Sequence, residues 1–515
     1  MERITMFANV LTAAILGLDV CPIRVEADVS DGLPSFTMVG FPSAQVREAQ
    51  DRVRTSFRNN GISLPPKRVT VNFSPADIRK EGAGYDLPVA AAVLAASGIL
   101  DPGLLKKVMM IGELSLNGDV RPVSGVLPII IKARELKCRF CIIPKGNLAE
   151  ARLLKDMPVI GVENLKEMIT ALLSPQFEES KDIEVVDGTC EAKKTETVDF
   201  EEVYGQVATR RATEIAVSGF HNILYIGSPG AGKTMMAKRI PTIMPQMTFE
   251  EEVEVTRIYS IAGLLSPKFP LIRNRPFRNP HHTSTPKSLS GGGMIPTPGE
   301  ITLAHRGVLF LDEMAEFSRE CLETLRQPLE DKKIQISRAG KTYVFPADFL
   351  LVAAINPCPC GYYPDMNRCR CSVREVTQYL RKISQPLLDR IDICTEVAEV
   401  DLQQIKQKEK GETSQEIRKR VEIARQIQSD RFKKETIRFN AQLIGREIEK
   451  YCPMTKEAEK LLDLAYEKMK FSMRSYHKIL KVARTIADLE QKDMIESNHI
   501  SEALNYKTID KKYWN

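Results

Sequence analysis

The segment GSPGAGKT, residues 227–234, decides how the rest of this chain is interpreted. It has the pattern G-x-x-x-x-G-K-[ST] of a phosphate-binding P-loop. The residues before it, NILYI (222–226), are typical of a short buried strand, and MMAKRI (235–240) can begin a helix. A strand, a glycine loop and a helix in this order are the context in which the motif holds a nucleotide.

Each residue type in this loop has a physical role. Glycines let the backbone turn its N–H groups toward phosphate oxygens, and the following helix adds the positive end of its dipole. Lys233 is expected to reach the β- and γ-phosphates of ATP, and the Thr234 hydroxyl is expected to hold Mg²⁺. The predicted nucleotide-binding residues are Gly227, Ser228, Pro229, Gly230, Ala231, Gly232, Lys233 and Thr234.

Two further apolar runs end in polar residues that suit ATP hydrolysis. GVLFLDE (307–313) predicts a buried strand that ends in two carboxylates. Asp312 would hold Mg²⁺ through water, and Glu313 would orient and deprotonate the attacking water. FLLVAAIN (349–356) predicts another strand, whose Asn356 would position that water or contact the γ-phosphate. The alternative for this asparagine is a turn residue at the end of a strand.

An arginine is expected to stabilise the charge that develops on the γ-phosphate. Arg390, in SQPLLDRID, suits an arginine finger, and Arg381 is the second choice. An ion pair with Asp389 or Asp392 is the structural alternative for Arg390. A finger that acts on a neighbouring subunit requires a ring or a filament.

The composition is that of an ordinary globular protein of about three domains. Of its 515 residues, 73 are Lys or Arg and 67 are Asp or Glu, so the net charge of +6 permits a polyanionic partner without demanding one. Eleven cysteines with no export signal favour a reducing, cytoplasmic location. The apolar stretch at residues 7–18 is too short to span a membrane and lacks the features of a signal peptide.

The fold class expected for the chain is α/β, in several units. They are a mixed α/β unit at 1–172, a polar and aperiodic linker at 173–198, a P-loop ATPase at 199–400 and a helical unit at 401–515. Strands of the first unit are expected at 21–29, 35–40, 68–73, 108–116 and 139–143, and its helices at 43–60, 86–98, 124–137 and 147–155.

The first unit resembles the proteolytic domain of Lon-type proteases. The resemblance rests on GLPSFTMVGFP, IRKEGAGYDLPVAAAVLA and GELSLNGDVRPVSGVLPIIIKAREL, and it covers most of the first 170 residues. Gly84 stands where that family places its nucleophilic serine, and Pro128 stands where it places the general-base lysine. Without a hydroxyl and a base there is no activated nucleophile, so a scaffold is expected and a peptidase is not. Lys132 lies nearby and is expected to be a solvated helix lysine.

Four cysteines lie close together in CPCGYYPDMNRCRC. Four thiolates in one loop can form a tetrahedral Zn²⁺ site, although C-x-C pairs are less usual than C-x-x-C pairs. In a reducing compartment this arrangement favours a metal over a disulfide, and free thiols are the alternative. The candidate ligands are Cys358, Cys360, Cys369 and Cys371.

The P-loop, GVLFLDE, PLLDRID and SMRSYHKILKVARTIADLE together resemble the Mg-chelatase-like AAA+ ATPases. A Lon-like domain followed by this ATPase is similar to the YifB/ComM family over nearly the whole chain, most specifically in RNPHHTSTPKSLSGGGMIPTPGEITLAHRGVLFLDEM. The resemblance implies a doubly wound parallel sheet, a C-terminal helical lid and an adenine pocket near Phe200, Val203 and Gly205. Arg474 is the lid arginine implied to contact the phosphates, with Arg484 as the alternative.

The same resemblance implies a hexameric DNA helicase that promotes branch migration. Two basic segments give partial support, because cations that line a pore would contact phosphates without reading sequence. They are an insertion with Arg273, Arg275, Arg278, His281, His282 and Lys287, and a hairpin with Lys332, Lys333, Arg338 and Lys341 around a turn at Gly340. The alternatives are surface cations that only aid solubility, and a chelatase-like ATPase that remodels a protein partner.

Overall fold

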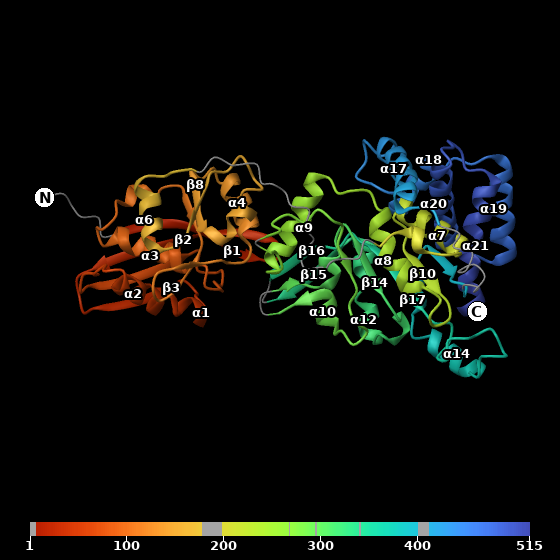
Figure 1. Cartoon of the computed structure of the whole chain (residues 1–515), viewed down its shortest axis with the longest axis horizontal. Helices are drawn as coiled ribbons and strands as arrows, with labels where there is room; N and C mark the ends of the chain where they lie inside the picture. Colours follow the sequence, from red (N-terminus) through yellow and green to blue (C-terminus); the bar gives the residue numbers. More distant parts are fainter. Residues whose placement is uncertain are drawn as a thin grey trace.

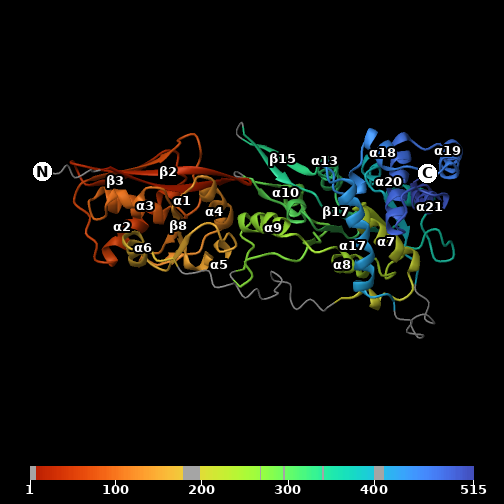
Figure 2. The same cartoon turned by 90° about the horizontal axis from the view of Figure 1, so that it is seen from above.

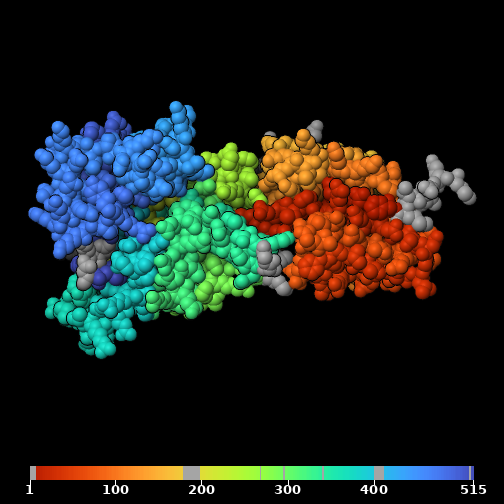
Figure 3. Space-filling view, turned by 180° about the vertical axis from the view of Figure 1, so that it is seen from behind, coloured from red at the N-terminus to blue at the C-terminus, as the bar shows by residue number. Residues whose placement is uncertain are grey.

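The computed structural model describes residues 7–177, 198–266, 268–293, 296–338, 341–399 and 411–514. Most of the predicted linker and the predicted hairpin turn at Gly340 lie outside these residues. The molecule is elongated, with the N-terminal unit at one end, the P-loop unit in the middle and the C-terminal helices at the other end (Figures 1 and 3). The α/β fold class is confirmed. Among the described helices, none has the length and apolar character needed to cross a bilayer.

The N-terminal unit is built on one seven-stranded mixed sheet. Its strand order is β3-β4-β2-β1-β5-β8-β9. The strands are β1 (Phe7–Leu16), β2 (Asp19–Ser30), β3 (Ser35–Val39), β4 (Arg68–Ser74), β5 (Val108–Met110), β8 (Phe140–Pro144) and β9 (Val159–Val162), with a separate pair β6 (Glu113–Leu114) and β7 (Val120–Arg121). The helices are α1 (Ala44–Arg47), α2 (Ala49–Asn59), α3 (Asp86–Ala96), α4 (Val126–Glu135), α5 (Leu148–Ala151) and α6 (Leu165–Leu173).

Several of these elements differ from the sequence-based expectation. The apolar stretch at residues 7–18 contains strand β1, which pairs with β2 along its full length. The expected strand at 108–116 is interrupted, because the backbone N–H of Gly112 turns away to bond the carbonyl of Gly84 at 2.9 Å. The expected helix at 43–60 is divided at Glu48 into α1 and α2, and α5 is shorter than expected.

The P-loop unit contains a five-stranded sheet in the order β11-β14-β17-β10-β18, and every pair in it is parallel. The strands are β10 (Ile223–Ile226), β11 (Phe277–Arg278), β14 (Val308–Leu311), β17 (Leu350–Ile355) and β18 (Ile393–Glu396). Alternate side chains of the central strands enter two different hydrophobic cores, one on each face of the sheet. Because both faces are covered, these strands are continuous apolar runs in the sequence.

The other elements of this unit surround the sheet. The helices are α7 (Val207–Gly219), α8 (Lys233–Ile243), α9 (Phe249–Ile261), α10 (Pro286–Ser290), α11 (Glu300–Leu303), α12 (Arg319–Glu323), α13 (Arg326–Asp331), α14 (Val373–Leu380) and α15 (Gln385–Leu388). Two antiparallel pairs complete it, namely β12 (Gly291–Gly292) with β13 (Thr297–Pro298), and the hairpin β15 (Lys333–Arg338) with β16 (Lys341–Pro346).

The hairpin and α9 connect this unit to the N-terminal unit. Figure 2 shows the hairpin projecting from the sheet toward the N-terminal unit. Tyr343 of β16 packs on Gly17, in the turn between β1 and β2. In α9, the Ser260 hydroxyl donates to the buried carboxyl group of Glu150. The backbone carbonyl of Ser260 accepts from the N–H of Gly125 at 3.1 Å. The N-terminal unit is therefore anchored by buried polar contacts as well as by packing.

The C-terminal helices share a core with the P-loop sheet. They are α17 (Ser414–Arg431), α18 (Arg446–Tyr451), α19 (Lys456–Met469), α20 (Met473–Leu489) and α21 (Ser497–Trp514). Val421 and Ile486, from two of these helices, belong to the same buried cluster as Ile223 and Val352 of the sheet. The helical unit is therefore packed directly on one face of the five-stranded parallel sheet.

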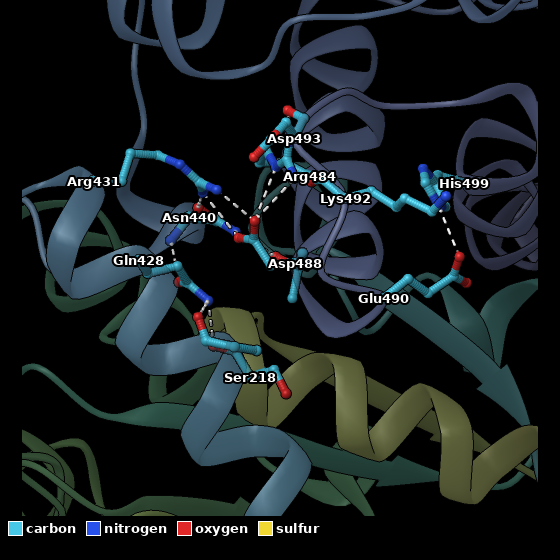
Figure 4. Close-up of polar contacts among 12 residues, drawn as sticks. Ser218, Gln428, Arg431, Asn440, Arg484, Asp488, Glu490, Lys492, Asp493 and His499 are labelled. Atoms are coloured by element: carbon cyan, nitrogen blue, oxygen red, sulfur yellow. Dashed lines mark hydrogen bonds and ion pairs between the residues drawn. The ribbon is translucent and has the colours of Figure 1, made fainter.

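A buried polar network fastens these helices to one another (Figure 4). The Asp488 carboxylate of α20 is fully buried and accepts from Arg431 at 2.9 Å, from Arg484 at 3.1 Å and from Asn440 at 2.7 Å. Gln428 of α17 extends the network by donating to the carbonyl of Ser218 in α7 at 3.0 Å. Arg484 is itself 1% exposed. This arrangement makes it a structural arginine and removes it as the alternative phosphate contact.

Replacing Asp488 with alanine should destabilise the helical unit strongly. Two arginines would lose their buried counter-ion, and such a loss costs roughly 3–5 kcal/mol. Urea unfolding followed by circular dichroism would measure the change in the free energy of unfolding. Asp430→Ala, which removes an exposed carboxylate from α17, is the matched control. Equal stability of the two variants would contradict this role for Asp488.

Candidate nucleotide-binding site

The P-loop connects β10 to α8 at the carboxyl edge of the parallel sheet. Gly230 and Gly232 have φ angles of 79° and 95°, which favour glycine. Gly227 lies so close to β18 that a Cβ atom there would be 2.5 Å from the carbonyl oxygen of Val397. The loop therefore needs glycine for its backbone shape and for its close approach to the neighbouring strand.

Lys233 joins the P-loop to the end of a neighbouring strand. Its ammonium group donates to the carbonyls of Gly227 at 2.7 Å and Ser228 at 2.9 Å, and to Oδ1 of Asn356 at 2.9 Å. Asn356 directly follows β17, so the structure brings together two residues that are far apart in the sequence. Burial lowers the pKa of Lys233 to about 8, although Asp312 and Glu313 act in the opposite direction.

Thr234 and Asp312 also meet at this edge. The Thr234 hydroxyl donates to Oδ2 of Asp312 at 2.8 Å, and Asp312 directly follows β14. A hydroxyl and a carboxylate are hard oxygen ligands of the kind that Mg²⁺ prefers. The residues present therefore fit the expected magnesium site.

Glu313 lies at the open side of the same edge. It has a φ angle of 50°, a left-handed conformation that is uncommon for a non-glycine residue. Its side chain is 56% exposed, and its Oε2 atom lies 3.8 Å from Nδ1 of His282. Sequence reasoning placed His282 among the basic residues of the insertion and preferred hydrogen bonding or packing over metal binding for the pair His281–His282, but it did not connect His282 with Glu313. Recognising the short strand β11 before it would have placed this histidine at the same edge.

Arg390 and Arg474 meet at one carboxylate. Arg390 forms an ion pair with Glu330 at the end of α13 and also donates to the carbonyl of Pro386 at 2.5 Å. Arg474, near the start of α20, donates to the other oxygen of Glu330 at 3.1 Å. Neither guanidinium forms a described hydrogen bond with the P-loop of its own chain. Arg381, the second choice for a finger, lines a separate surface hollow with Arg319 and Arg374.

The four cysteines of the predicted metal site converge. The sulfur atoms of Cys358, Cys360, Cys369 and Cys371 all lie within 4.8 Å of one another, and none is in a disulfide. The N–H groups of Gly361 and Tyr363 donate to the sulfur of Cys358 at 3.2 and 3.4 Å. Backbone donation from Tyr362 is the main effect that lowers the pKa of Cys360. A compact set of four thiols that accept N–H donors fits a tetrahedral zinc ion.

The positions that the Lon-type resemblance assigns to catalysis carry no catalytic side chains. A Cβ atom at Gly84 would lie 3.1 Å from the side chain of Ile111, so this position is already closely packed. Pro128 is buried in α4. Lys132 forms a surface ion pair with Glu135 at 2.8 Å.

Six of the ten predicted pore cations fall into two groups. Lys333, Arg338 and Lys341 are exposed on the hairpin. Three others are engaged within the subunit: Arg275 pairs with Glu251 at 3.1 Å, Arg278 with Glu300 at 2.6 Å and Lys332 with Asp348 at 3.9 Å. Within the exposed group, Lys341 lies 3.7 Å from Asp77 of the N-terminal unit, whereas Lys333 and Arg338 form no described ion pair.

Comparisons with known proteins cover nearly the whole chain. Residues 199–405 match the family model described as magnesium chelatase, subunit ChlI, residues 25–147 match subunit ChlI of Mg-chelatase, and residues 411–507 match the ChlI C-terminal model. Competence protein ComM of Haemophilus influenzae is 41% identical over 504 residues, which are 98% of this chain and 97% of that protein. The uncharacterized protein YifB of Salmonella typhimurium is 40% identical over 507 residues, again 98% and 97% of the two chains.

A weaker similarity connects part of the chain to a protease. The Lon protease of Roseiflexus castenholzii is 25% identical over 166 residues, which are 30% of this chain and 20% of that protein.

The affinity for ATP should depend on pH through Lys233. The protonated form attracts phosphate, so its contribution is present below its pKa of about 8 and is lost as the pH rises through that value. Between pH 7 and 9.5, the association constant for MgATP should level off at the low end and fall by up to about tenfold per pH unit at the high end. Nucleotide titrations would measure it.

Lys233→Met supplies the control for this pH profile. It should bind nucleotide more weakly and with little dependence on pH over the same range. A wild-type affinity that stayed constant up to pH 9.5 would contradict the lowered pKa.

Proposed function

This chain belongs to the ComM/YifB family of Mg-chelatase-like proteins, within the AAA+ ATPase superfamily, and we propose that it is an ATP-driven motor acting on DNA. The observation that carries the proposal is the convergence of Lys233, Thr234, Asp312 and Asn356 at one edge of a parallel sheet. The DNA partner is supported by the family and by the exposed cations of the hairpin.

Each group at this edge has a proposed task. Lys233 now donates to three protein oxygens, and the phosphates of ATP would take over these hydrogen bonds. A magnesium ion held by Thr234 and Asp312 would neutralise the charge of the phosphate oxygens. Glu313 would accept the proton of the attacking water, and Asn356 would fix the position of that water.

The position of the two arginines favours action between subunits. Arg390 and Arg474 share Glu330 and form no described hydrogen bond with their own P-loop. We place both at a seam between copies, where they would contact the γ-phosphate held by the neighbouring subunit. A closed ring gives every nucleotide such a neighbour, and a hexamer is the proposed assembly.

The DNA contact is assigned to the hairpin β15–β16. Lys333, Arg338 and Lys341 are exposed there, and lysine and arginine contacts to phosphate are independent of base sequence. More specifically, we propose that the protein is a cytoplasmic DNA helicase that promotes branch migration. A second candidate function is that of an ATPase that remodels a protein partner. The matches to the ChlI models support this alternative.

The remaining parts complete the proposal. Residues 1–172 would be a scaffold derived from a Lon-like protease domain, 173–198 a linker, 199–400 the ATPase and 401–515 the helical lid. Cys358, Cys360, Cys369 and Cys371 would hold one structural zinc ion, supported by their mutual proximity.

Glu313→Gln should separate nucleotide binding from hydrolysis. The amide cannot accept the proton of the attacking water, so the turnover number should fall by about 10²–10⁴, while the dissociation constant for ATP should change little. Steady-state ATPase assays and nucleotide titrations would measure the two quantities. Glu316→Gln, which removes a nearby carboxylate paired with Lys382, is the control and should keep its turnover. Normal hydrolysis by the Glu313 variant would refute the assignment.

DNA should stimulate the ATPase in a manner that depends on salt. The binding constant for single-stranded DNA should fall linearly on a log–log plot against salt, with a slope near −0.7 for each phosphate contacted. Replacing Lys333, Arg338 and Lys341 with glutamine should weaken binding and make this slope less steep by up to about 2. ATPase assays with single-stranded and branched DNA at several salt concentrations would test this.

The control for this experiment removes three lysines from the far end of the molecule. Lys456, Lys460 and Lys468 are exposed on α19, away from the hairpin (Figure 1). Their replacement with glutamine changes the net charge equally and should leave the DNA response intact. If DNA did not change the ATPase rate at any salt concentration, the proposed DNA motor would be wrong and an ATPase that remodels a protein partner would be favoured.

A further inference from the structure

We propose that the cysteine loop, residues 357–372, forms one wall of the nucleotide site, so that metal binding and ATP binding strengthen each other. The inference rests on the proposed zinc site and on the proposed ATPase. It gives the metal a role in nucleotide affinity, which neither proposal requires.

The cysteine loop starts at Asn356, and the helix that follows the loop packs in the same core. The loop begins with Pro357, directly after this residue, and it leads into α14. In that helix, Tyr379 belongs to the same buried cluster as Ile355 and Cys358, which flank Asn356 and Pro357. The side chain of the same asparagine accepts from Lys233 at 2.9 Å. The folding of the loop therefore fixes a residue that touches the P-loop lysine.

The loop also touches the P-loop directly. Gly361 lies against Pro229, and a Cβ atom at position 361 would be only 2.3 Å from the Cδ atom of that proline. Gly361 has a φ angle of 87°, so any other residue there would be strained as well as obstructed. The two loops therefore approach as closely as a missing side chain allows, and a displacement of one would displace the other.

A carboxylate bridges the two loops on a second side. Glu399 accepts from Arg368 of the cysteine loop, with one guanidinium nitrogen 2.7 and 2.8 Å from its two oxygens. Arg368 is the main group that lowers the pKa of this carboxyl, and the side chain of Ser228 in the P-loop acts in the same direction, so Glu399 lies beside both loops. The Arg368 guanidinium also stacks at 4.1 Å over the ring of Tyr362. The segment between the two cysteine pairs is thus connected to the phosphate-binding loop.

These contacts predict a reciprocal coupling. This sixteen-residue loop contains four cysteines, three prolines and only one glycine, and it has little apolar core of its own. A metal ion that binds four thiolates would therefore supply much of its order. With the metal bound, the wall of the nucleotide site is already in place, and ATP does not have to order it. By linkage, ATP must then raise the affinity for the metal by the same factor as the metal raises the affinity for ATP.

The test uses the full-length protein purified under reducing conditions. Elemental analysis should find about one zinc ion per chain. Nucleotide titrations of the zinc-loaded and chelator-treated protein, with circular dichroism to verify the fold, should show about tenfold weaker binding of a non-hydrolysable ATP analogue after metal removal. Competition with a zinc-selective chelator should show an equal increase in zinc affinity when the analogue and Mg²⁺ are present.

Two substitutions in the same loop sharpen the test. Arg368→Gln keeps all four thiols but removes the link to Glu399, so zinc should remain bound while the coupling factor falls toward one. Arg370→Gln removes an exposed arginine that forms no described side-chain contact with the P-loop, and the coupling should persist. Glu399→Gln should behave like the first variant, because it removes the shared carboxylate.

The possible outcomes separate the three proposals. A well-folded protein without zinc would overturn the metal site and with it the coupling. One bound zinc, normal ATP binding and a coupling factor of one in the wild-type protein would overturn only the coupling. Absence of nucleotide binding in the zinc-loaded protein would overturn the proposed ATPase. Equal reciprocal factors that disappear in Arg368→Gln and persist in Arg370→Gln would establish the inference.

Discussion

The hydrogen bond between Lys233 and Asn356 is the contact on which the candidate site depends. It joins the loop after β10 to the end of β17, and it can form only because these two strands are parallel neighbours in the sheet. The same geometry places Asp312, after the next strand, within reach of Thr234. A single register of parallel strands thus assembles two pairs of groups that are 123 and 78 residues apart in the chain.

The sequence predicted most of this edge, because each group follows a continuous apolar run. Strands that are buried on both faces are easy to recognise, and the residue after each one lies at the carboxyl edge of the sheet. The contact between His282 and Glu313 was not predicted, because β11 is only two residues long and has no recognisable pattern. The assigned roles of Glu313, Asn356, Arg390 and Arg474 stay predictions.

Tertiary contacts explain the remaining differences. Arg484 was considered a possible phosphate contact because it lies on the lid helix, but only the folded structure shows that it is buried against Asp488. Lys332 was grouped with the hairpin cations, but its backbone ends α13 and its side chain faces Asp348. Periodicity could not reveal either fact, since both depend on segments distant in the sequence. The domain boundaries also stay predictions, because residues 178–197 and 400–410 lie outside the described chain.

Glu330 gives the proposed assembly a further property. Its carboxylate forms ion pairs with Arg390 and Arg474 of the same chain. In an unassembled copy, both arginines are therefore already paired. Their release would require a competing anion of higher charge, which a bound triphosphate on an adjoining copy would supply. A single unassembled chain would then hydrolyse ATP slowly even when it is saturated with ATP. The rate of ATP hydrolysis in the cell would depend on the number of interfaces between assembled subunits rather than on the total number of chains.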